Sequence, residues 1–346
     1  MANKKVLITG ITGQDGAYLA KFLLKKGYKV FGLYRRTSSP NTWRLLSLGI
    51  QNKIELIPGD MTDMASINNA IVQSDPDEIY NLAAQSFVGT SFEQPLVTAH
   101  VDGLGAVMLL EAAKQINPKI KIYQASTSEL YGNNKDINRD GLLNENSVLW
   151  PLSPYAASKL YAFHQVRIYR EAYGMFIVNG ILFNHESPLR GLEFVTRKIS
   201  NAVVRIKLGL QKTLELGNID SVRDWGYAPE YVEAMWLMLQ QENPDDFVIA
   251  TGEKHSVKEF LDCSCRYLDL DVNKIFNQNQ RLLRPLDVNY LLGDASKARR
   301  VLKWAPKVTF HKLAEIMVKE DLKRWQDHIN GKLFAWDAIN DPSVYM

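Results

Sequence analysis

The sequence predicts an α/β protein built on a doubly wound parallel sheet, with a smaller α/β lobe attached. Three observations favour this class. Residues 5–34 have the pattern of a strand, a glycine turn, a helix and a second strand; strand and helix patterns alternate through the first half; and the alternation ends after Asn184. Such alternation is typical of a parallel sheet covered by helices on both faces, the Rossmann-type architecture.

Each element in the first half follows from its pattern. Short strand-like runs alternate with amphipathic helical stretches. Ser153 and Pro154 indicate the start of a helix, because serine is a common N-cap residue and proline is favoured at the first helical position. The expected strands are Lys5–Thr9, Lys29–Tyr34, Ile54–Pro58, Glu78–Leu82, Ile120–Ser126 and Phe176–Leu182. The expected helices include Ala17–Lys26, closed by Gly27, Met64–Ser74, Val101–Gln115 and Pro154–Tyr173.

The second half is less regular. We expect residues 1–183 to form the dinucleotide-binding lobe, with returns near 225–251 and 288–300, and residues 184–346 to form most of the second lobe. Its two clear helical patterns are Glu193–Leu208 and Pro229–Gln240. Cys263 and Cys265 lie two apart on a predicted helix and point in different directions, so we expect free thiols and no metal site.

The composition and net charge limit the kinds of ligand and cellular location that we expect. The 346 residues include 46% hydrophobic and 23% charged residues, which is ordinary for a globular protein. A formal charge of +3 is too small to favour nucleic acid but suits an anionic small substrate. Because residues 1–5 lead straight into a strand and no apolar run approaches about 18 residues, we expect a cytoplasmic protein without signal peptide or membrane span.

The glycine turn after the first strand predicts nucleotide binding. Gly10 permits the tight turn, Gly13 lets the backbone approach a pyrophosphate at the helix N-terminus, and Gly16 allows close helix packing. The Gly-x-x-Gly-x-x-Gly spacing is one residue longer than the usual dehydrogenase pattern, and a plain glycine turn is the alternative. The flanking strand and helix favour the nucleotide site.

The residues after the second strand select the cofactor. Arg35 and Arg36, followed by hydroxyl side chains, suit the 2′-phosphate of NADP, whereas an NAD site usually has an acid there. The alternative is a solvated basic loop. We expect NADP.

Tyr155 and Lys159 form the next signal. Residues four apart on a helix share a face, so the ammonium lies near the phenol and should lower its pKa. A phenolate of this kind can take a proton from a sugar hydroxyl near neutral pH. The spacing alone is common; after a glycine turn and at a helix start it is specific.

Together these motifs resemble the extended short-chain dehydrogenase/reductase family, and within it the branch of nucleotide-sugar 4,6-dehydratases. The likeness runs from about residue 4 to about residue 325. The further stretches that carry it are Asn81–Gly89, Gln124–Gly132, Asn184–Gly191 and Arg223–Gly226.

The resemblance implies a hydro-lyase that converts GDP-D-mannose to GDP-4-keto-6-deoxy-D-mannose by moving a hydride from C4 to C6, a step in the biosynthesis of deoxysugars such as those of GDP-fucose or GDP-rhamnose. The implied catalytic residues are Thr127, Glu129, Tyr155 and Lys159. Glu129 would remove the C5 proton, a step that simple reductases do not need; a helix-capping or solvated glutamate is the alternative.

The resemblance also implies the binding residues. Tyr123 is a further candidate contact for the nicotinamide half. Cofactor contacts are expected at Gly10, Thr12, Gly13, Gln14, Asp15, Gly16, Arg35, Arg36, Asp60, Met61, Leu82, Ala83, Ala84, Gln85, Tyr155, Lys159, Leu182, Asn184, His185 and Arg190. Substrate contacts are expected at Ser86, Ser126, Asn184, Lys198, Gly217, Arg223, Arg284 and Asp287.

Some positions depart from the family pattern. Asp287 stands where a glutamate is expected and Asn289 where an aspartate is usual, which leaves a guanine or ribose contact open. The loop Arg35–Arg44 resembles one that reaches a neighbouring subunit and implies a homotetramer; a polar loop on a monomer is the alternative. The competing activities are the same dehydration of a related sugar such as GDP-D-manno-heptose, a 4-epimerase or 4-reductase, and a cofactor-binding scaffold without chemistry.

Overall fold

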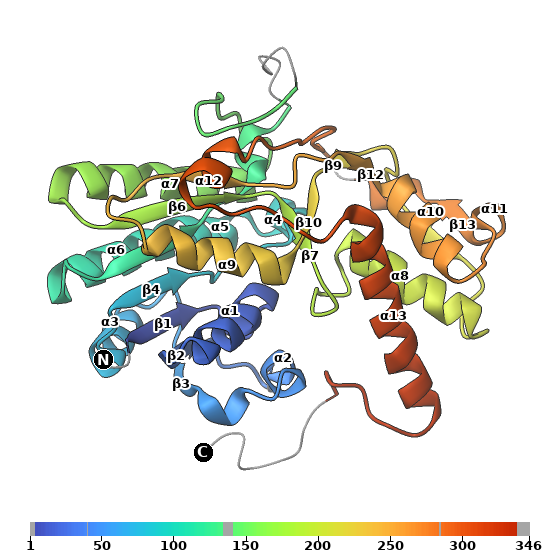
Figure 1. Ribbon diagram of the computed structural model, residues 1–346, viewed down its shortest axis with the longest axis horizontal. Helices are drawn as coiled ribbons and strands as arrows, with labels where there is room; N and C mark the ends of the chain where they lie inside the picture. The colour runs from blue at the N-terminus through green and yellow to red at the C-terminus, as the bar shows by residue number, and fades with distance from the viewer. Residues whose placement is uncertain (1–3, 40, 134–140, 284, 338–346) are drawn as a thin grey trace.

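The computed structural model describes residues 4–39, 41–133, 141–283 and 285–337. Its centre is a seven-stranded sheet in which all neighbouring strands are parallel (Figure 1). In sheet order the strands are β11 (Phe247–Ile249), β6 (Ile177–Leu182), β5 (Lys121–Ala125), β4 (Glu78–Asn81), β1 (Lys5–Thr9), β2 (Lys29–Tyr34) and β3 (Glu55–Pro58). The predicted doubly wound parallel sheet is confirmed, and the ends of the six expected strands lie within one residue of their predicted positions.

The seventh strand comes from the second half of the chain. Residues 247–249 pair with β6 at one edge of the sheet. The segment near residues 290–293 does not become a strand of this sheet: Tyr290 and Gly293 make single bridges to Val222 and Leu143. Gly293 instead packs against Ala250, so the segment lies on the sheet's edge without joining it.

Helices cover both faces of the sheet. Helices α1 and α9 pack together on one face, and α3, α6 and α7 on the other. The helices of this part are α1 (Gln14–Lys25), α2 (Trp43–Ser47), η1 (Gln51–Lys53), α3 (Met64–Ser74), α4 (Val88–Glu93), α5 (Pro95–Thr98), η2 (Ala99–Leu104), α6 (Gly105–Ile116), η3 (Ser128–Tyr131), α7 (Pro154–Tyr173), α9 (Ala228–Leu239) and α12 (Ser296–Val301).

The strands are largely apolar because both faces of the sheet are buried. Successive side chains alternate between the two cores: Ile8 and Val178 lie in the core under α1 and α9, whereas Leu7 and Ile177 lie in the core under α3 and α6. This period of two is what a strand geometry imposes. Both faces of the sheet are therefore packed against helices, and this packing positions the edge at which the carboxyl ends of the strands lie.

The expected helix Val101–Gln115 has two parts. Its first residues lie in η2, which is a π-helix, and the rest in α6. Together with α5 it forms a stretch, Pro95–Ile116, that is long and apolar enough to span a membrane, although half of it is buried here. Polar residues such as His100, Asp102 and Glu111 divide this stretch, so it is not a continuous apolar run, but its mean hydropathy still reaches 1.4. The buried core helix of a globular protein passes the same test of length and composition.

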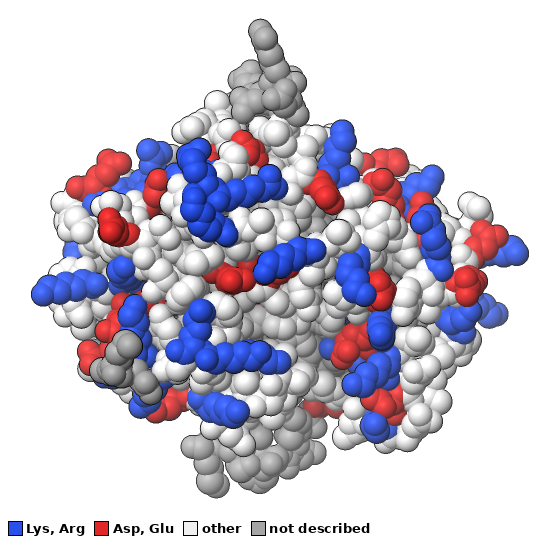
Figure 2. Space-filling view, viewed as in Figure 1, with Lys and Arg blue, Asp and Glu red and all other residues white. Residues whose placement is uncertain are grey.

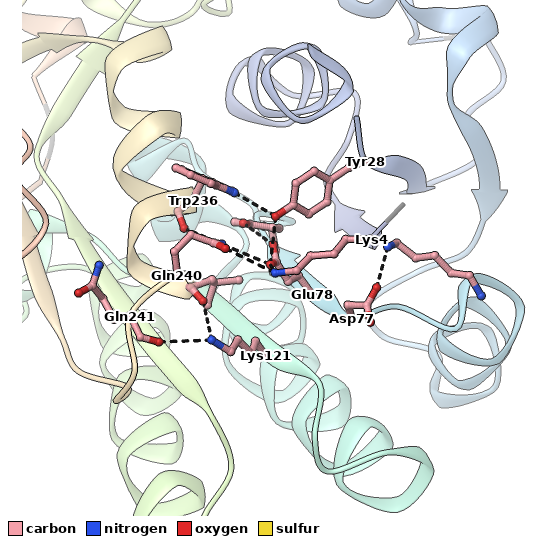
Figure 3. Close-up of polar contacts among 11 residues, drawn as sticks. Lys4, Tyr28, Asp77, Glu78, Lys121, Trp236, Gln240 and Gln241 are labelled. Atoms are coloured by element: carbon pink, nitrogen blue, oxygen red, sulfur yellow. Dashed lines mark hydrogen bonds and ion pairs between the residues drawn. The ribbon is translucent and has the colours of Figure 1, made fainter. Parts of the chain in front are cut away.

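A polar cluster ties the amino edge of the sheet together (Figure 3). The buried carboxylate of Glu78, at the start of β4, accepts hydrogen bonds from Lys4, Tyr28, Tyr80 and Gln240 at 2.9, 3.2, 3.0 and 3.3 Å. These side chains come from before β1, from the α1–β2 turn, from β4 itself and from the end of α9. Glu78 thus links α9 to the sheet at the edge opposite the strands' carboxyl ends.

The remaining elements form the second lobe, which lies to the right in Figure 1. Helices α8, α10 and α13 pack on one another around a core that includes Trp225, Phe260 and Phe310. The elements are β7 (Asn184–Glu186), α8 (Val195–Lys207), β8 (Leu214–Leu216), β9 (Val222–Arg223), β10 (Trp225–Tyr227), β12 (His255–Ser256), α10 (Val257–Tyr267), α11 (Val272–Ile275), β13 (Phe276–Gln278), η4 (Gln280–Leu282) and α13 (Phe310–Ile329). Cys263 and Cys265 are free thiols on α10, as predicted.

The surface carries both signs of charge. On the face seen in Figure 2, basic and acidic side chains are interspersed. This agrees with the small formal charge of +3.

Candidate active site

A cavity of 1160 Å³ lies between the carboxyl edge of the sheet and the second lobe. The ends of β1, β2, β3, β4, β5 and β6 contribute to one side, and residues of α8, β9 and η4 to the other. Ligands of parallel α/β proteins bind at this edge. The topology thus collects residues from the whole chain into one site.

The glycine turn forms one end of the cavity. Gly10 has φ +66°, and a Cβ there would meet the Ala83 nitrogen at 2.8 Å; a Cβ on Gly16 would meet the Gly10 carbonyl at 2.4 Å. Gly13 caps α1 without any side-chain hydrogen bond to the first helical N–H groups. Backbone N–H groups at such a helix start suit the phosphates of a dinucleotide. The residues present therefore fit a nicotinamide dinucleotide.

The four predicted catalytic residues line the same cavity: Thr127, Glu129, Tyr155 and Lys159. Thr127 precedes η3, and its Oγ1 accepts the N–H of Glu129 at 3.2 Å. Ser153 caps α7 by accepting the N–H of Ala156 at 3.1 Å, as the sequence predicted. This cap fixes where the helix begins and therefore where Tyr155 and Lys159 lie.

One electrostatic prediction at this site was wrong. Burial raises the pKa of Tyr155; the carboxylate of Asp102 raises it further, and a hydrogen bond with Thr127 opposes the rise. The Lys159 ammonium does not offset this, because its Nζ lies 5.9 Å from the centre of the Tyr155 ring and donates to the Ala125 carbonyl at 3.2 Å. Burial lowers the pKa of Lys159, and Asp102 opposes that change.

Asp102 is the functional candidate that sequence reasoning missed. It is buried in η2, and its Oδ1 accepts the N–H of Gln85 at 2.7 Å. Burial raises the pKa of its carboxyl to about 6, against the opposing effect of Lys159. The signal that could have identified it is an acidic residue within an otherwise apolar helical stretch.

Most predicted cofactor residues line the cavity, but two candidates do not. Arg36 is exposed and is not part of the cavity wall, and Tyr123 is fully buried in the core against Gly180. The predicted contacts that do line the cavity are Gly10, Thr12, Gly13, Gln14, Asp15, Gly16, Arg35, Asp60, Met61, Leu82, Ala83, Ala84, Gln85, Tyr155, Lys159, Leu182, Asn184, His185 and Arg190.

Three of these residues are also bonded to one another. Gln14 donates to the His185 carbonyl at 3.1 Å, and the His185 ring lies 2.7 Å from a carboxylate oxygen of Asp15. The first turn of α1 is thereby joined to β7.

Arg44 has a role inside its own chain. Its Nε donates to the Leu189 carbonyl at 2.7 Å and its Nη1 to the Thr12 carbonyl at 3.1 Å. It also lines the cavity, with Arg190 nearby, whose guanidinium pairs with Glu186 at 3.2 Å and lies over the Phe194 ring. The last residue of the loop Arg35–Arg44 is therefore used within the chain itself.

The predicted substrate residues come from both sides of the cavity: Ser126 follows β5 of the sheet, whereas Lys198 and Arg223 belong to the second lobe. Arg223 pairs with Asp287 at 3.4 Å, and Ser221 also donates to Asp287 at 3.2 Å. Burial lowers the pKa of Lys198. Arg284 lies outside the described residues. The predicted contacts that line the cavity are Ser86, Ser126, Asn184, Lys198, Gly217, Arg223 and Asp287.

The described residues contain no group of three or more metal-ligating side chains. The ionisable and hydroxyl side chains of the predicted catalytic set, which line the cavity, are a phenol, an ammonium, a hydroxyl and a carboxylate.

Sequence comparison finds close relatives over nearly the whole chain. The family model described as "GDP-mannose 4,6 dehydratase" matches residues 7–317. GDP-mannose 4,6 dehydratase 1 of Arabidopsis thaliana is 52% identical over 330 residues, which cover 92% of this chain and 90% of that protein. The GDP-mannose 4,6 dehydratase of Homo sapiens is 47% identical over 353 residues, covering 94% and 93%.

Structure comparison finds enzymes with the same fold. The UDP-glucose 4-epimerase of Thermus thermophilus, solved with NAD, has a TM-score of 0.79 at 25% identity, with 95% of this chain and 99% of that chain covered. The dTDP-glucose 4,6-dehydratase of Bacillus anthracis, also solved with NAD, has a TM-score of 0.80 at 23% identity, with 93% and 97% covered.

Proposed function

This chain belongs to the GDP-mannose 4,6-dehydratase family, and from that premise we propose that it converts GDP-D-mannose to GDP-4-keto-6-deoxy-D-mannose. The observation that carries the proposal is the meeting of Glu129 with Thr127, Tyr155 and Lys159 in one cavity with the glycine turn. A reductase or 4-epimerase needs the phenol and ammonium but no carboxylate beside C5.

The residues divide the proton transfers between them. Tyr155 would take the proton of the 4-hydroxyl once the positive charge of an oxidised nicotinamide lowers its pKa from the raised value in the free site. Thr127 would donate a hydrogen bond to the C4 oxygen as charge develops there. The 4-ketone acidifies C5, so Glu129 removes that proton and returns a proton to the departing C6 hydroxyl, which leaves as water. A nicotinamide cofactor supplies an acceptor for the C4 hydride and a donor to C6. A proton returned to C5 completes an internal redox reaction.

For the cofactor we propose NADP. Arg35 lines the cavity just beyond the end of β2, next to where a dinucleotide would place its adenosine ribose. A guanidinium suits a 2′-phosphate. Equilibrium binding of NADP and NAD, in the wild type and in Arg35→Gln, tests this: the substitution should weaken NADP and leave NAD nearly unchanged, whereas equal weakening of both would contradict it.

For the nucleotide-sugar diphosphate we propose Lys198 and Arg223, with Arg284 as a third cation, because guanidinium and ammonium groups suit a pyrophosphate. We also propose a cytoplasmic homotetramer whose contacts involve residues 35–39, which are exposed. Light scattering after size-exclusion chromatography measures its mass; a monomer at micromolar concentration would contradict it.

The decisive experiment is incubation of purified protein with GDP-mannose and no added reductant. We expect a product lighter by one water, with deuterium at C5 when the reaction runs in D₂O. If only GDP-D-manno-heptose loses water, the sugar assignment is wrong and the dehydration stands. A C4 epimer without C5 exchange would favour an epimerase instead.

Glu129→Gln separates the steps. The amide cannot take the C5 proton, so turnover should fall by roughly 10²–10⁴-fold, while the first hydride transfer still produces the reduced-nicotinamide absorbance. The matched control is Glu171→Gln, an exposed glutamate on α7 that should keep wild-type turnover. Unchanged dehydration by Glu129→Gln would remove this residue from the mechanism.

A further inference from the structure

The buried ring of His185 faces an acceptor at each nitrogen. Nδ1 lies 2.8 Å from the Phe183 carbonyl, and Nε2 lies 2.7 Å from Oδ2 of Asp15. A carbonyl only accepts, so Nδ1 carries a hydrogen. A carboxylate also only accepts, so Nε2 carries one as well and the ring is an imidazolium. Oδ1 of Asp15 accepts from Gln14 at 3.1 Å, which occupies the other carboxylate oxygen.

Asp15 stands where a negative charge is unfavourable for the proposed cofactor. It lies in the first turn of α1, directly after the uncapped N-terminus at Gly13, and it lines the cavity. A dinucleotide places two phosphates at this helix end. An unneutralised carboxylate there would repel them at short range.

The surroundings of His185 support the charged form. Its ring stacks on the Tyr231 ring of α9 at 4.6 Å between centroids, and Arg190 is the like charge that opposes it. Burial alone lowers the pKa of His185, but the ion pair and hydrogen bond with Asp15 outweigh it and the pKa is raised. Burial also raises the pKa of Asp15, but the interactions with His185 outweigh burial and the pKa of Asp15 is lowered.

We infer that His185 and Asp15 are a positioning pair: the imidazolium neutralises the carboxylate at the start of α1, so that cofactor affinity depends on the proton at Nε2. This role rests on the proposed function, because it needs a dinucleotide at the glycine turn. The role inferred for Asp15 is electrostatic: one of its oxygens faces His185 and the other accepts a hydrogen bond from Gln14.

The direction of the pH effect follows from the charges. Below the pKa of His185 the pair is neutral; above it the proton leaves and Asp15 keeps its charge. The dissociation constant of NADPH should therefore rise as pH rises above the ordinary histidine value of 6.5. The rise is about tenfold for each unit by which bound phosphates raise this pKa.

The test measures NADPH binding by its fluorescence from about pH 7 to about pH 9.5, above most of the ionisation of the ligand's phosphates. Asp15→Asn removes the charge and should give a dissociation constant that no longer depends on pH. His185→Gln leaves the charge unneutralised at every pH, so its dissociation constant should not depend on pH; it should lie about tenfold above the wild-type value at pH 7 and approach the wild-type value as pH rises. The double variant Asp15→Asn/His185→Gln should recover most of that loss. His164→Gln, on an exposed face of α7, is the control and should follow the wild type.

Two results would overturn the inference. One is a double variant that binds as weakly as His185→Gln, because a purely structural role gives no rescue. The other is a ¹⁵N imidazole spectrum showing a neutral His185 ring at pH 7. The spectrum does not need the cofactor, so it tests the pair even if the protein binds no dinucleotide at any pH, which would refute the proposed function instead.

Discussion

The carboxylate of Asp102 affects the pKa values of Tyr155 and Lys159, although Asp102 does not line the cavity. It raises the pKa of Tyr155 and supports the ammonium form of Lys159. Its own Oδ2 has no hydrogen-bond partner among the described residues. At the residue scale, the buried carboxylate of Asp102 lowers stability when it is charged and acts on the pKa of both Tyr155 and Lys159.

We predict that Asp102→Asn has two measurable effects. Without the carboxylate the pKa of Tyr155 falls, so the acidic limb of the pH–rate profile should move to lower pH. Stability should also rise. The carboxyl has a pKa of about 6 in the folded protein against an ordinary 3.8, so the folded state binds more protons within that window and stability falls as pH increases through it.

The gain at pH 7 should be about 1–3 kcal/mol, since asparagine can still accept the Gln85 N–H. Urea unfolding at pH 7 and at about pH 4 measures it. The gain should be smaller at the lower pH. If Asp102→Asn changes neither the acidic limb of the pH–rate profile nor the free energy of unfolding, the Asp102 carboxyl is neutral or solvated in the folded protein.

At the element scale, the cluster around Glu78 secures α9 to the sheet. Glu78→Ala leaves four donors without their acceptor and should lower the free energy of unfolding by about 2–4 kcal/mol. Turnover per folded molecule should be unchanged, because Glu78 is the first residue of β4 and the cavity lies at the carboxyl ends of the strands. Glu55→Ala is the matched control: its ion pair with Lys29 is half exposed on both sides and is worth under about 1 kcal/mol. Equal losses in both variants would contradict a special role for the cluster.

Elements with a local signal were predictable from the sequence. The beginning of α7 follows from Ser153 and Pro154, and strands β1 and β2 have the predicted bounds. The π-helix η2 was not predictable, because local sequence does not determine whether each N–H bonds to the carbonyl four or five residues before it. Packing against α7, a tertiary contact, contributes to that pattern. Tyr123 was misplaced for a related reason: the strand pattern gives alternation but not which face meets the cavity.

At the scale of the whole molecule, the cavity exists only because the chain returns to the sheet. Glu129 and Lys198 come from different lobes, and Arg44 and Leu189 are joined across 145 positions of the chain. Residue types and a family resemblance predicted the chemistry, and most of the residues that they singled out line the cavity. The sequence could not show that Arg44 donates to the Leu189 carbonyl of its own chain or that Asp15 pairs with His185. Both contacts join segments that are distant in the sequence.

The loop 187–191 joins the two lobes from both sides. Its Pro188 and Leu189 carbonyls accept hydrogen bonds from Arg324 of α13 at 2.6 Å and from Arg44 of α2 at 2.7 Å, and Ser187 donates to Gln14 at 2.7 Å. A hinge opening of the lobes would have to break either the Arg324 bond or both the Arg44 and Gln14 bonds, depending on the lobe with which the loop moved. The Leu189 and Arg190 N–H groups donate to the Ser187 hydroxyl and carbonyl at 3.0 Å each, so their hydrogen exchange with solvent should be slow. A ligand would then enter a cavity whose wall at this loop keeps its shape from one turnover to the next.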